Sequence, residues 1–311
     1  MSTAYLTHPD ALRHCTPSGH PEQVARMEAI TAALAATEFD ALTRHDAPPA
    51  DEAQLLLCHP PEYLDRIRMA IPPAGIYQLD ADTHVSTGSL DAALRAAGGA
   101  CHAVDLVMDG HAANAFVAMR PPGHHAERAT PMGFCLFGNV AIAARHAMER
   151  HGLSRVAVVD FDVHHGNGTQ DLLWDEARAF FVSSHQMPLW PGTGRADERG
   201  AHGQVMNVPL APGTDGVGFR RIYEDMILPQ LDRFAPELVL ISAGFDAHRD
   251  DPLAELALTE ADFAWVTGAL CDIAARHAKG RVVSCLEGGY ELDALAASVA
   301  THVRVLMERG A

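Results

Sequence analysis

Short apolar runs alternate with longer amphipathic stretches along most of the chain. The apolar runs are rich in β-branched residues and predict five strands, at Ala115–Met119, Arg155–Phe161, Ala179–Ser184, Glu237–Ala243 and Arg281–Leu286. Apolar residues at helical spacing predict five helices, at Leu90–Met108, Val140–Arg150, Gly216–Phe234, Glu260–Ala278 and Asp293–Met307. This alternation predicts an α/β fold in which a mainly parallel multi-stranded sheet is covered by helices on both faces.

Local signals mark where two of these helices begin, end or break. Thr259 and Asp262 have the spacing of a capping box at the start of the fourth helix. Gly280 stands just past the end of that helix, where a left-handed residue is usual. Pro229 lies inside the third helix, so we expect a kink or break there.

No linker, internal repeat or low-complexity tract interrupts the 311 residues, and hydrophobic residues make up 48% of them. We therefore expect residues 1–311 to form a single domain with a full core. The first residues lack a basic region followed by an apolar stretch. No apolar run approaches the roughly 20 residues that span a bilayer. These features predict a cytoplasmic protein with no membrane partner.

The charge balance disfavours one class of partner. Lys and Arg number 23 and Asp and Glu 40, so the net charge is −17. Nucleic acid is not expected as a partner, because its phosphate backbone requires a basic surface. The charge suits a cationic substrate such as a lysine-rich peptide or a polyamine, although an acidic surface that maintains solubility explains it equally well. The six cysteines form no C-x-x-C pair, so no disulfide framework is expected.

The most informative polar residues follow the predicted strand that ends near Phe161. Asp160, Asp162 and His164 are two residues apart, and residues at this spacing in an extended chain point to the same side. Two carboxylates and an imidazole at the end of a buried strand make a poor core and a good metal site. Their oxygen and nitrogen atoms suit zinc, with iron or cobalt as competitors.

Each of the other predicted strands is also followed directly by a polar or unusual sequence. These sequences are Arg120-Pro121-Pro122-Gly123-His124-His125, Ser183-Ser184-His185, Gly244-Phe245-Asp246 and Glu287-Gly288-Gly289-Tyr290. In open α/β sheets, ligands bind outside the carboxyl ends of the strands. We therefore expect the active site at this edge of the sheet.

These five segments, in this order, resemble the histone deacetylase superfamily of zinc amidohydrolases. The superfamily includes acetylpolyamine amidohydrolases and bacterial deacetylase-like proteins. The likeness runs from about Pro9 to the last predicted helix, so it covers nearly the whole chain. It implies a single catalytic domain with an arginase/deacetylase-like sheet.

The resemblance also implies two ions. Asp162, His164 and Asp246 match the ligands of one catalytic zinc, and three protein ligands leave a position open for water and substrate. Taken alone, Asp246 would be interpreted as a capping or turn residue. A structural potassium ion is implied by five residues that match the family's site: Asp160, Asp162, the backbone of His164, Ser183 and Ser184.

The family's paired catalytic histidines correspond to His124 and His125. By the same resemblance, Asp160 would hold a ring nitrogen of His124, and Asn167 would hold that of His125. Many relatives have an aspartate in place of Asn167, and the asparagine resembles the class II branch. A neutral amide orients an imidazole with less charge, so it puts the resting basicity of His125 in question.

Tyr290 matches the family's catalytic tyrosine and would donate a hydrogen bond to the developing oxyanion. His125 is our candidate for general base and then general acid, with His124 as electrostatic support. The division of labour between these two histidines stays open on sequence alone. The zinc would activate water by lowering its pKa towards about 7.

The resemblance also implies a narrow substrate channel lined by Gly133, Phe134 and Trp190, with Cys135 near its floor. Leu253 matches the specificity position at the channel mouth. The polyamine-selective branch carries a glutamate there, so a leucine favours N-acyl-lysine or related N-acyl amides.

Three alternatives to a deacetylase of N-acyl-lysine remain. An acetylpolyamine amidohydrolase would use the same metal ligands and catalytic residues but would differ at the mouth of the substrate channel. A manganese ureohydrolase of the arginase type would need further carboxylate ligands for a second metal. A catalytically silent acyl-lysine reader would not need the complete set of ligands, histidines and tyrosine. The physiological substrate, the acyl-chain preference, the metal loaded in vivo and the oligomeric state stay open, and an oligomer is possible.

Overall fold

Eight parallel strands form the central sheet of the computed structural model, which describes residues 2–311. Their order is β2-β1-β5-β10-β9-β6-β7-β8, and every neighbouring pair runs parallel. The strands are β1 (Thr3–Thr7), β2 (Thr43–Asp46), β5 (Asn114–Val117), β6 (Val156–Asp160), β7 (Ala179–Gln186), β8 (Val205–Leu210), β9 (Leu238–Ala243) and β10 (Val282–Leu286). The predicted parallel sheet is confirmed.

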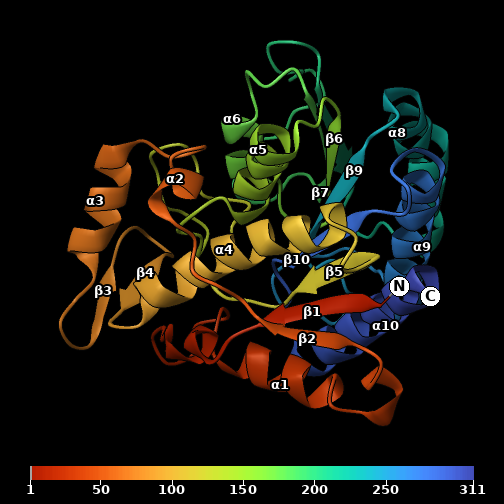
Figure 1. Cartoon of the computed structure of the whole chain (residues 1–311). Coiled ribbons are helices and arrows are strands. Elements are labelled where there is room, and N and C mark those ends of the chain that lie inside the picture. Colours follow the sequence, from red (N-terminus) through yellow and green to blue (C-terminus); the bar gives the residue numbers. More distant parts are fainter. Residues whose placement is uncertain (1) are drawn as a thin grey trace.

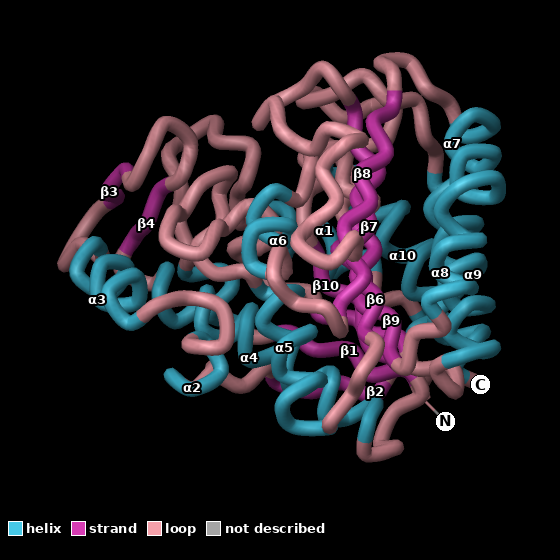
Figure 2. Tube along the Cα trace, turned by 90° about the horizontal axis from the view of Figure 1, so that it is seen from above, coloured by secondary structure: helices cyan, strands magenta, loops and turns pink. Residues whose placement is uncertain are grey.

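Helices cover both faces of this sheet, as predicted (Figure 1). They are α1 (Ala25–Ala33), α2 (Glu52–Leu55), α3 (Pro61–Ala70), α4 (Ser89–Met108), α5 (Asn139–His151), α6 (Asn167–Leu172), α7 (Gly216–Ile222), α8 (Leu228–Phe234), α9 (Glu260–His277) and α10 (Leu292–Gly310). Figure 2 shows α4, α5 and α6 on one side of the sheet and α7, α8 and α9 on the other. Helix α10 packs against both α9 and α1, which places these helices in the second layer.

The central strands owe their position to their composition. Every residue of β6, β9 and β10 is buried, and these strands are rich in Val, Leu and Ile. A strand covered on both faces requires such a continuous apolar run. Most buried apolar residues of the described chain form one continuous core around these strands.

The predicted capping box and C-terminal glycine of α9 occur in the structure, and the predicted break near Pro229 takes the form of a π-helical turn. The Asp262 carboxylate accepts a hydrogen bond from the backbone N–H of Thr259 (2.9 Å), and Gly280 adopts φ = 80°. The helix predicted over residues 216–234 is interrupted by a π-helical turn at Tyr223–Ile227, and α8 starts directly before Pro229. The break follows from the missing N–H of proline, which cannot close a regular helical hydrogen bond.

Several elements were not predicted. They are the strands β1, β2 and β8, the helices α1, α2, α3 and α6, and a separate antiparallel pair of β3 (Ile76–Gln78) and β4 (His84–Ser86). All six cysteines are free, and five of them are buried. Within residues 2–311, no helix is long and apolar enough to cross a bilayer.

Candidate active site

The metal ligands expected from the sequence lie together at the carboxyl edge of the sheet. Asp162 and His164 follow β6, and Asp246 follows the neighbouring strand β9. Nδ1 of His164 is 3.2 Å from Asp162 Oδ1 and 3.1 Å from Asp246 Oδ2. All three residues are buried. Two carboxylate oxygens and one imidazole nitrogen therefore converge on a single point.

The electrostatics of this point favour a cation. Burial, together with the nearby Asp162 carboxylate, raises the pKa of Asp246 to about 7. Burial alone would lower the pKa of His164, but its hydrogen bonds to Asp162 and Asp246 raise it to about 10. Two carboxylates this close repel each other unless positive charge lies between them. A divalent ion suits this donor set and relieves the repulsion.

Backbone groups fix the two carboxylates from behind. The N–H of Gly288 donates to Asp162 Oδ2 (2.9 Å), and the N–H of Val163 donates to Asp246 Oδ1 (2.9 Å). A Cβ atom at position 288 would lie 2.2 Å from Asp246 Oδ2 and 2.6 Å from Asp162 Oδ2. The close approach of this backbone therefore requires glycine.

The two adjacent histidines lie beside the metal ligands with different partners. Nδ1 of His124 is 2.9 Å from Asp160 Oδ2, and Nδ1 of His125 is 2.7 Å from Asn167 Oδ1. The amide nitrogen of Asn167 donates to Glu127 Oε1 (2.9 Å), which turns its oxygen towards His125. An oxygen there can only accept, so Nδ1 of His125 carries the proton. The lone pair of His125 is therefore on Nε2.

These environments move the two histidine pKa values apart. Burial alone would lower the pKa of His124, but the carboxylates of Asp162 and Asp160 raise it well above its usual value. Burial lowers the pKa of His125 well below its usual value, and the positive charges of His124 and His164 lower it further. The first imidazole is suited to carry charge and the second to accept a proton.

Buried charged residues position the histidine loop. Glu287 Oε2 accepts hydrogen bonds from the N–H groups of Gly123 (2.7 Å) and His124 (3.1 Å). The guanidinium of Arg120 pairs with Glu22, with 2.6 Å between Nη2 and Oε2. Since all these groups are buried, they hold the loop in place from the protein interior.

Tyr290 is held by two further residues that were not predicted. Arg26 donates to the carbonyl oxygen of Gly289 (2.6 Å), and its guanidinium lies 5.0 Å from the centre of the Tyr290 ring. The carboxylate of Asp251 accepts from the N–H of Tyr290 (2.7 Å) and from that of Leu253 (3.0 Å). Asp251 thus ties the tyrosine to the residue expected at the channel mouth.

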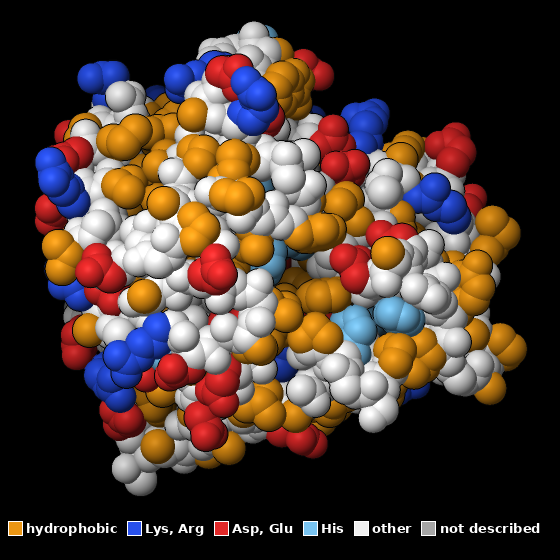
Figure 3. All heavy atoms as spheres, turned by 180° about the vertical axis from the view of Figure 1, so that it is seen from behind, with side chains coloured by type: hydrophobic (Ala, Val, Ile, Leu, Met, Phe, Trp, Pro, Cys, Tyr) orange, Lys and Arg blue, Asp and Glu red, His pale blue; other side chains and the backbone are white. Residues whose placement is uncertain are grey.

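A cavity of about 220 Å³ leads to these groups. It opens on the face seen in Figure 3, where histidine lies inside a hollow surrounded by apolar side chains. It is lined by Asp82, His125, Gly133, Phe134, His164, Leu189, Trp190, Leu253 and Tyr290. All four residues expected from the sequence to form a substrate channel therefore lie on one cavity.

The wall of the cavity depends on an unusual backbone at Gly133 and Phe134, with φ angles of 57° and 68°. A Cβ atom at Gly133 would lie 2.4 Å from His125 and 2.7 Å from Trp190. The N–H of Gly133 donates to Asp82 Oδ1 (3.1 Å), and a role for Asp82 was not predicted. Asp82 thus fixes the backbone of the wall at Gly133.

Asp160, Ser183 and Ser184, three of the residues expected to bind potassium, lie on the neighbouring strands β6 and β7. The hydroxyl of Ser184 donates to the carbonyl oxygen of Asp160 (3.4 Å), and Oγ of Ser183 is 3.0 Å from His185 Nδ1. Asp160 also accepts from the N–H of Asp162 (3.0 Å), which links this region to the metal ligands.

Comparisons with known proteins agree with this geometry. The sequence model of the histone deacetylase domain matches residues 20–306. A histone deacetylase-like amidohydrolase of Pseudomonas aeruginosa is 40% identical, with 88% of this chain and 73% of that protein covered. The human polyamine deacetylase HDAC10 is 37% identical over 99% of this chain and 48% of its own length.

A solved structure, the crystal structure of the HDA15 HD domain, has the same fold. Its TM-score is 0.93, at 33% sequence identity, and the match covers 99% of this chain and 88% of that one. The likeness therefore includes the sheet and all five loops at its carboxyl edge.

Proposed function

Because the chain belongs to the histone deacetylase family, we propose that it is a zinc-dependent amidohydrolase of N-acyl-lysine or related N-acyl amides. Its relatives make it a hydrolase of the deacetylase class, and residues 1–311 would act as one catalytic domain. The observation that carries the proposal is the convergence of a metal-ligand triad, a histidine pair and a tyrosine on one narrow cavity.

Asp162, His164 and Asp246 would hold the zinc ion, since their buried oxygen and nitrogen atoms fit it. When bound there, zinc supplies Lewis acidity that activates water and polarises the scissile carbonyl group. Asp160, Asp162, the backbone of His164, Ser183 and Ser184 would hold a structural potassium ion. This second ion would support the ligand strand from behind.

His125 acts as the general base in this proposal. Its Nε2 takes a proton from the attacking water, because Nδ1 is occupied by Asn167. The same nitrogen then delivers that proton to the amine as the carbon–nitrogen bond breaks, so the proton count balances. His124 stays protonated beside Asp160 and stabilises the negative charge that develops.

Tyr290 donates its hydroxyl proton in a hydrogen bond to the carbonyl oxygen as that atom becomes negative. Its ring centroid lies 5.8 Å from that of Phe134, and the ring of Trp190 packs edge to face against His125, with 4.7 Å between the centroids. Phe134, Trp190 and Gly133 would enclose the apolar stem of an acyl-lysine side chain, which keeps bulk water from the reacting amide.

The choice between acyl-lysine and acetylpolyamine depends on the cavity mouth. The similarity to a polyamine deacetylase keeps the second substrate open. Leu253 offers no charge for a second ammonium group. Asp82 also lines the cavity, and its Oδ1 accepts from Thr83 (3.0 Å) and Gly133 (3.1 Å) as part of the cavity wall. On the basis of Leu253 we favour N-acyl-lysine.

The test compares turnover of an acetyl-lysine peptide and of acetylspermidine on one zinc-loaded preparation, with a chelator control. Preference for the peptide that the chelator abolishes supports the proposal. Preference for the polyamine assigns the chain to the acetylpolyamine amidohydrolases. Turnover of arginine would indicate a ureohydrolase. The absence of turnover of every amide, despite bound zinc, would indicate an acyl-lysine reader.

A further inference from the structure

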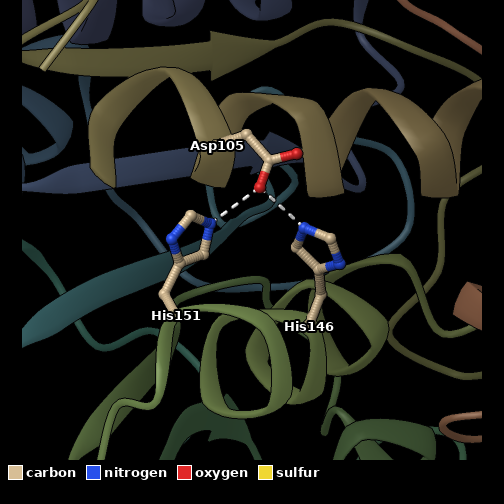
Figure 4. Close-up of side chains that lie close together, drawn as sticks. All are labelled: Asp105, His146 and His151. Atoms are coloured by element: carbon tan, nitrogen blue, oxygen red, sulfur yellow. Dashed lines mark hydrogen bonds and ion pairs between the residues drawn. The ribbon is translucent and has the colours of Figure 1, made fainter. Parts of the chain in front are cut away.

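A second cluster of histidine and carboxylate side chains lies between α4 and α5, apart from the catalytic cavity. Asp105 belongs to the last turn of α4, and His146 and His151 belong to α5. Figure 4 shows both imidazoles directed from α5 towards the same carboxylate oxygen. Nε2 of His146 lies 2.8 Å from Asp105 Oδ1, and Nε2 of His151 lies 2.7 Å from it.

We propose that Asp105, His146 and His151 form a second metal site, which binds a divalent transition metal such as zinc and clamps α4 to α5. The site is independent of the proposed catalytic function, because none of these residues lines the catalytic cavity. Two imidazole nitrogens and one carboxylate oxygen are a donor set that zinc accepts readily.

The geometry needs only a small adjustment to hold an ion. The three donor atoms lie within 4.8 Å of one another. Ligands about 2.0–2.1 Å from a tetrahedral zinc lie roughly 3.3 Å apart. The nitrogen–oxygen separations here are shorter, so a slight rotation of the carboxylate would open the space. Asp105 and His146 also line an open surface depression, together with Asp51, Gln54 and Glu149, so an ion can reach the cluster from solvent.

The local field attracts positive charge. Asp105 and His151 both lie in the last turn of their helices, where unpaired carbonyl groups and the helix dipole favour a cation. Burial alone would raise the pKa of Asp105, but the hydrogen bonds from His146 and His151 hold it below its usual value. The carboxylate is therefore ionised at neutral pH.

Arg150 already forms an ion pair with Asp105. Its Nε lies 3.1 Å from Asp105 Oδ1, and its side chain is 61% exposed. An exposed guanidinium can turn into solvent, so it does not block the ion. The side chains of His146 and His151 are only 8% and 12% exposed, so the two nitrogen ligands are already ordered.

The rival interpretation is a hydrogen-bonded cluster without metal, in which both imidazoles donate Nε2–H to one oxygen. Glutamine at position 151 separates the two, because it keeps a donor near the carboxylate but is a poor zinc ligand. His111→Gln is the matched control, since His111 is exposed and follows α4 closely.

The experiment measures the number of zinc ions bound per full chain by mass spectrometry. The protein is first stripped of metal with a chelator and then dialysed against zinc. Asp246→Ala, which disables the catalytic ligands, isolates the second site, so the count does not depend on the proposed function. We expect one zinc per chain in Asp246→Ala and in Asp246→Ala/His111→Gln, and none in Asp246→Ala/His151→Gln or Asp246→Ala/His146→Gln.

Thermal unfolding provides a second measurement. Zinc should raise the Tm of Asp246→Ala and leave that of Asp246→Ala/His151→Gln unchanged, because an ion bound only to the folded state stabilises it. The His151→Gln chain with an intact catalytic site should keep its amidase activity, which shows that it folds. No zinc in Asp246→Ala, or equal zinc with and without His151, would overturn the proposal.

Discussion

His124 and His125 are adjacent in the chain, with ring centroids 3.9 Å apart, yet only His124 faces a carboxylate. The partner of His125 is the amide oxygen of Asn167, which orients the ring without adding charge. The pKa of His124 is raised and that of His125 is lowered. Two titratable groups whose pKa values are pushed apart are typical of a site that divides charge stabilisation from proton transfer.

Replacing Asn167 with aspartate tests this division. A carboxylate near Nδ1 of His125 would raise the pKa of that imidazole, and a protonated imidazole cannot act as base. The acidic limb of the kcat/KM profile should therefore move to higher pH by about 1–2 units, with turnover at high pH retained. The measurement is kcat/KM from pH 5 to 9. An unmoved limb in the variant would mean that His125 is not the base.

Tyr290→Phe removes the hydroxyl that is proposed to stabilise the oxyanion. The expected loss in kcat is roughly 10²–10³, with little change in KM or zinc content, because the ring still packs against Phe134. Steady-state kinetics and metal analysis measure both. Tyr77→Phe is the control, since Tyr77 is 54% exposed on β3. Turnover at the wild-type rate in Tyr290→Phe would remove this residue from the mechanism.

Leu253→Glu places a carboxylate at the cavity mouth. A hydrogen bond to a charged group contributes about 1.5–3 kcal/mol, so acetylspermidine should gain about tenfold or more in kcat/KM relative to acetyl-lysine peptide. Leu12→Glu adds the same charge at an exposed residue that does not line this cavity and should leave the ratio unchanged. An equal ratio in both variants would show that Leu253 does not select the substrate.

The strands that the sequence predicted are those that the fold buries most fully. β6, β9 and β10 are buried along their whole length, so each reads as an apolar run. β2 lies at the edge of the sheet with the sequence Thr-Arg-His-Asp, mostly exposed, and such a strand has no apolar signal. Its strand conformation comes from pairing with β1, and this pairing leaves no pattern in the sequence of β2 itself.

The same distinction applies to the candidate site. The residues proposed to carry the chemistry stand in unusual sequences at the strand ends, and the resemblance to the histone deacetylase superfamily assigned their roles. Arg26 and Glu22 act on the backbone or on each other, and both are fully buried. An arginine in a short helix is usually solvent-exposed. Only the packing of α1 beside the Tyr290 loop buries it, so the sequence alone gave no signal.

Gly288→Ala tests the crowded backbone behind the metal ligands. The added Cβ would collide with the carboxylates of Asp162 and Asp246, so zinc affinity and kcat/KM should fall by about 10–100-fold. Gly268→Ala is the matched control. Gly268 lies inside α9, and the atom nearest to a Cβ at this position is 3.8 Å away. That change should raise stability by about 0.5–1 kcal/mol. Zinc titration with a competing chelator distinguishes the two, and equal affinity in both variants would contradict the crowding argument.

His302 makes stability depend on pH in a predictable direction. It is fully buried, with Nδ1 2.7 Å from Thr267 Oγ1 and Nε2 2.9 Å from Ser284 Oγ, and burial lowers its pKa to about 3. The unfolded chain takes up this proton near pH 6.5 and the folded chain does not, so protonation favours unfolding as the pH falls below 6.5. The contribution of the neutral imidazole is complete above that pH and is lost as the pH falls towards 3.

His302→Gln keeps a polar side chain and removes the titration. Between pH 7.5 and 5, the wild-type free energy of unfolding should therefore fall by about 2 kcal/mol more than that of the variant. Urea unfolding at several pH values measures this difference. The variant can be less stable at every pH, because the test depends only on how the gap between the two proteins changes. A gap that stays constant from pH 7.5 to 5 would mean that His302 becomes protonated in the folded protein as readily as in the unfolded chain.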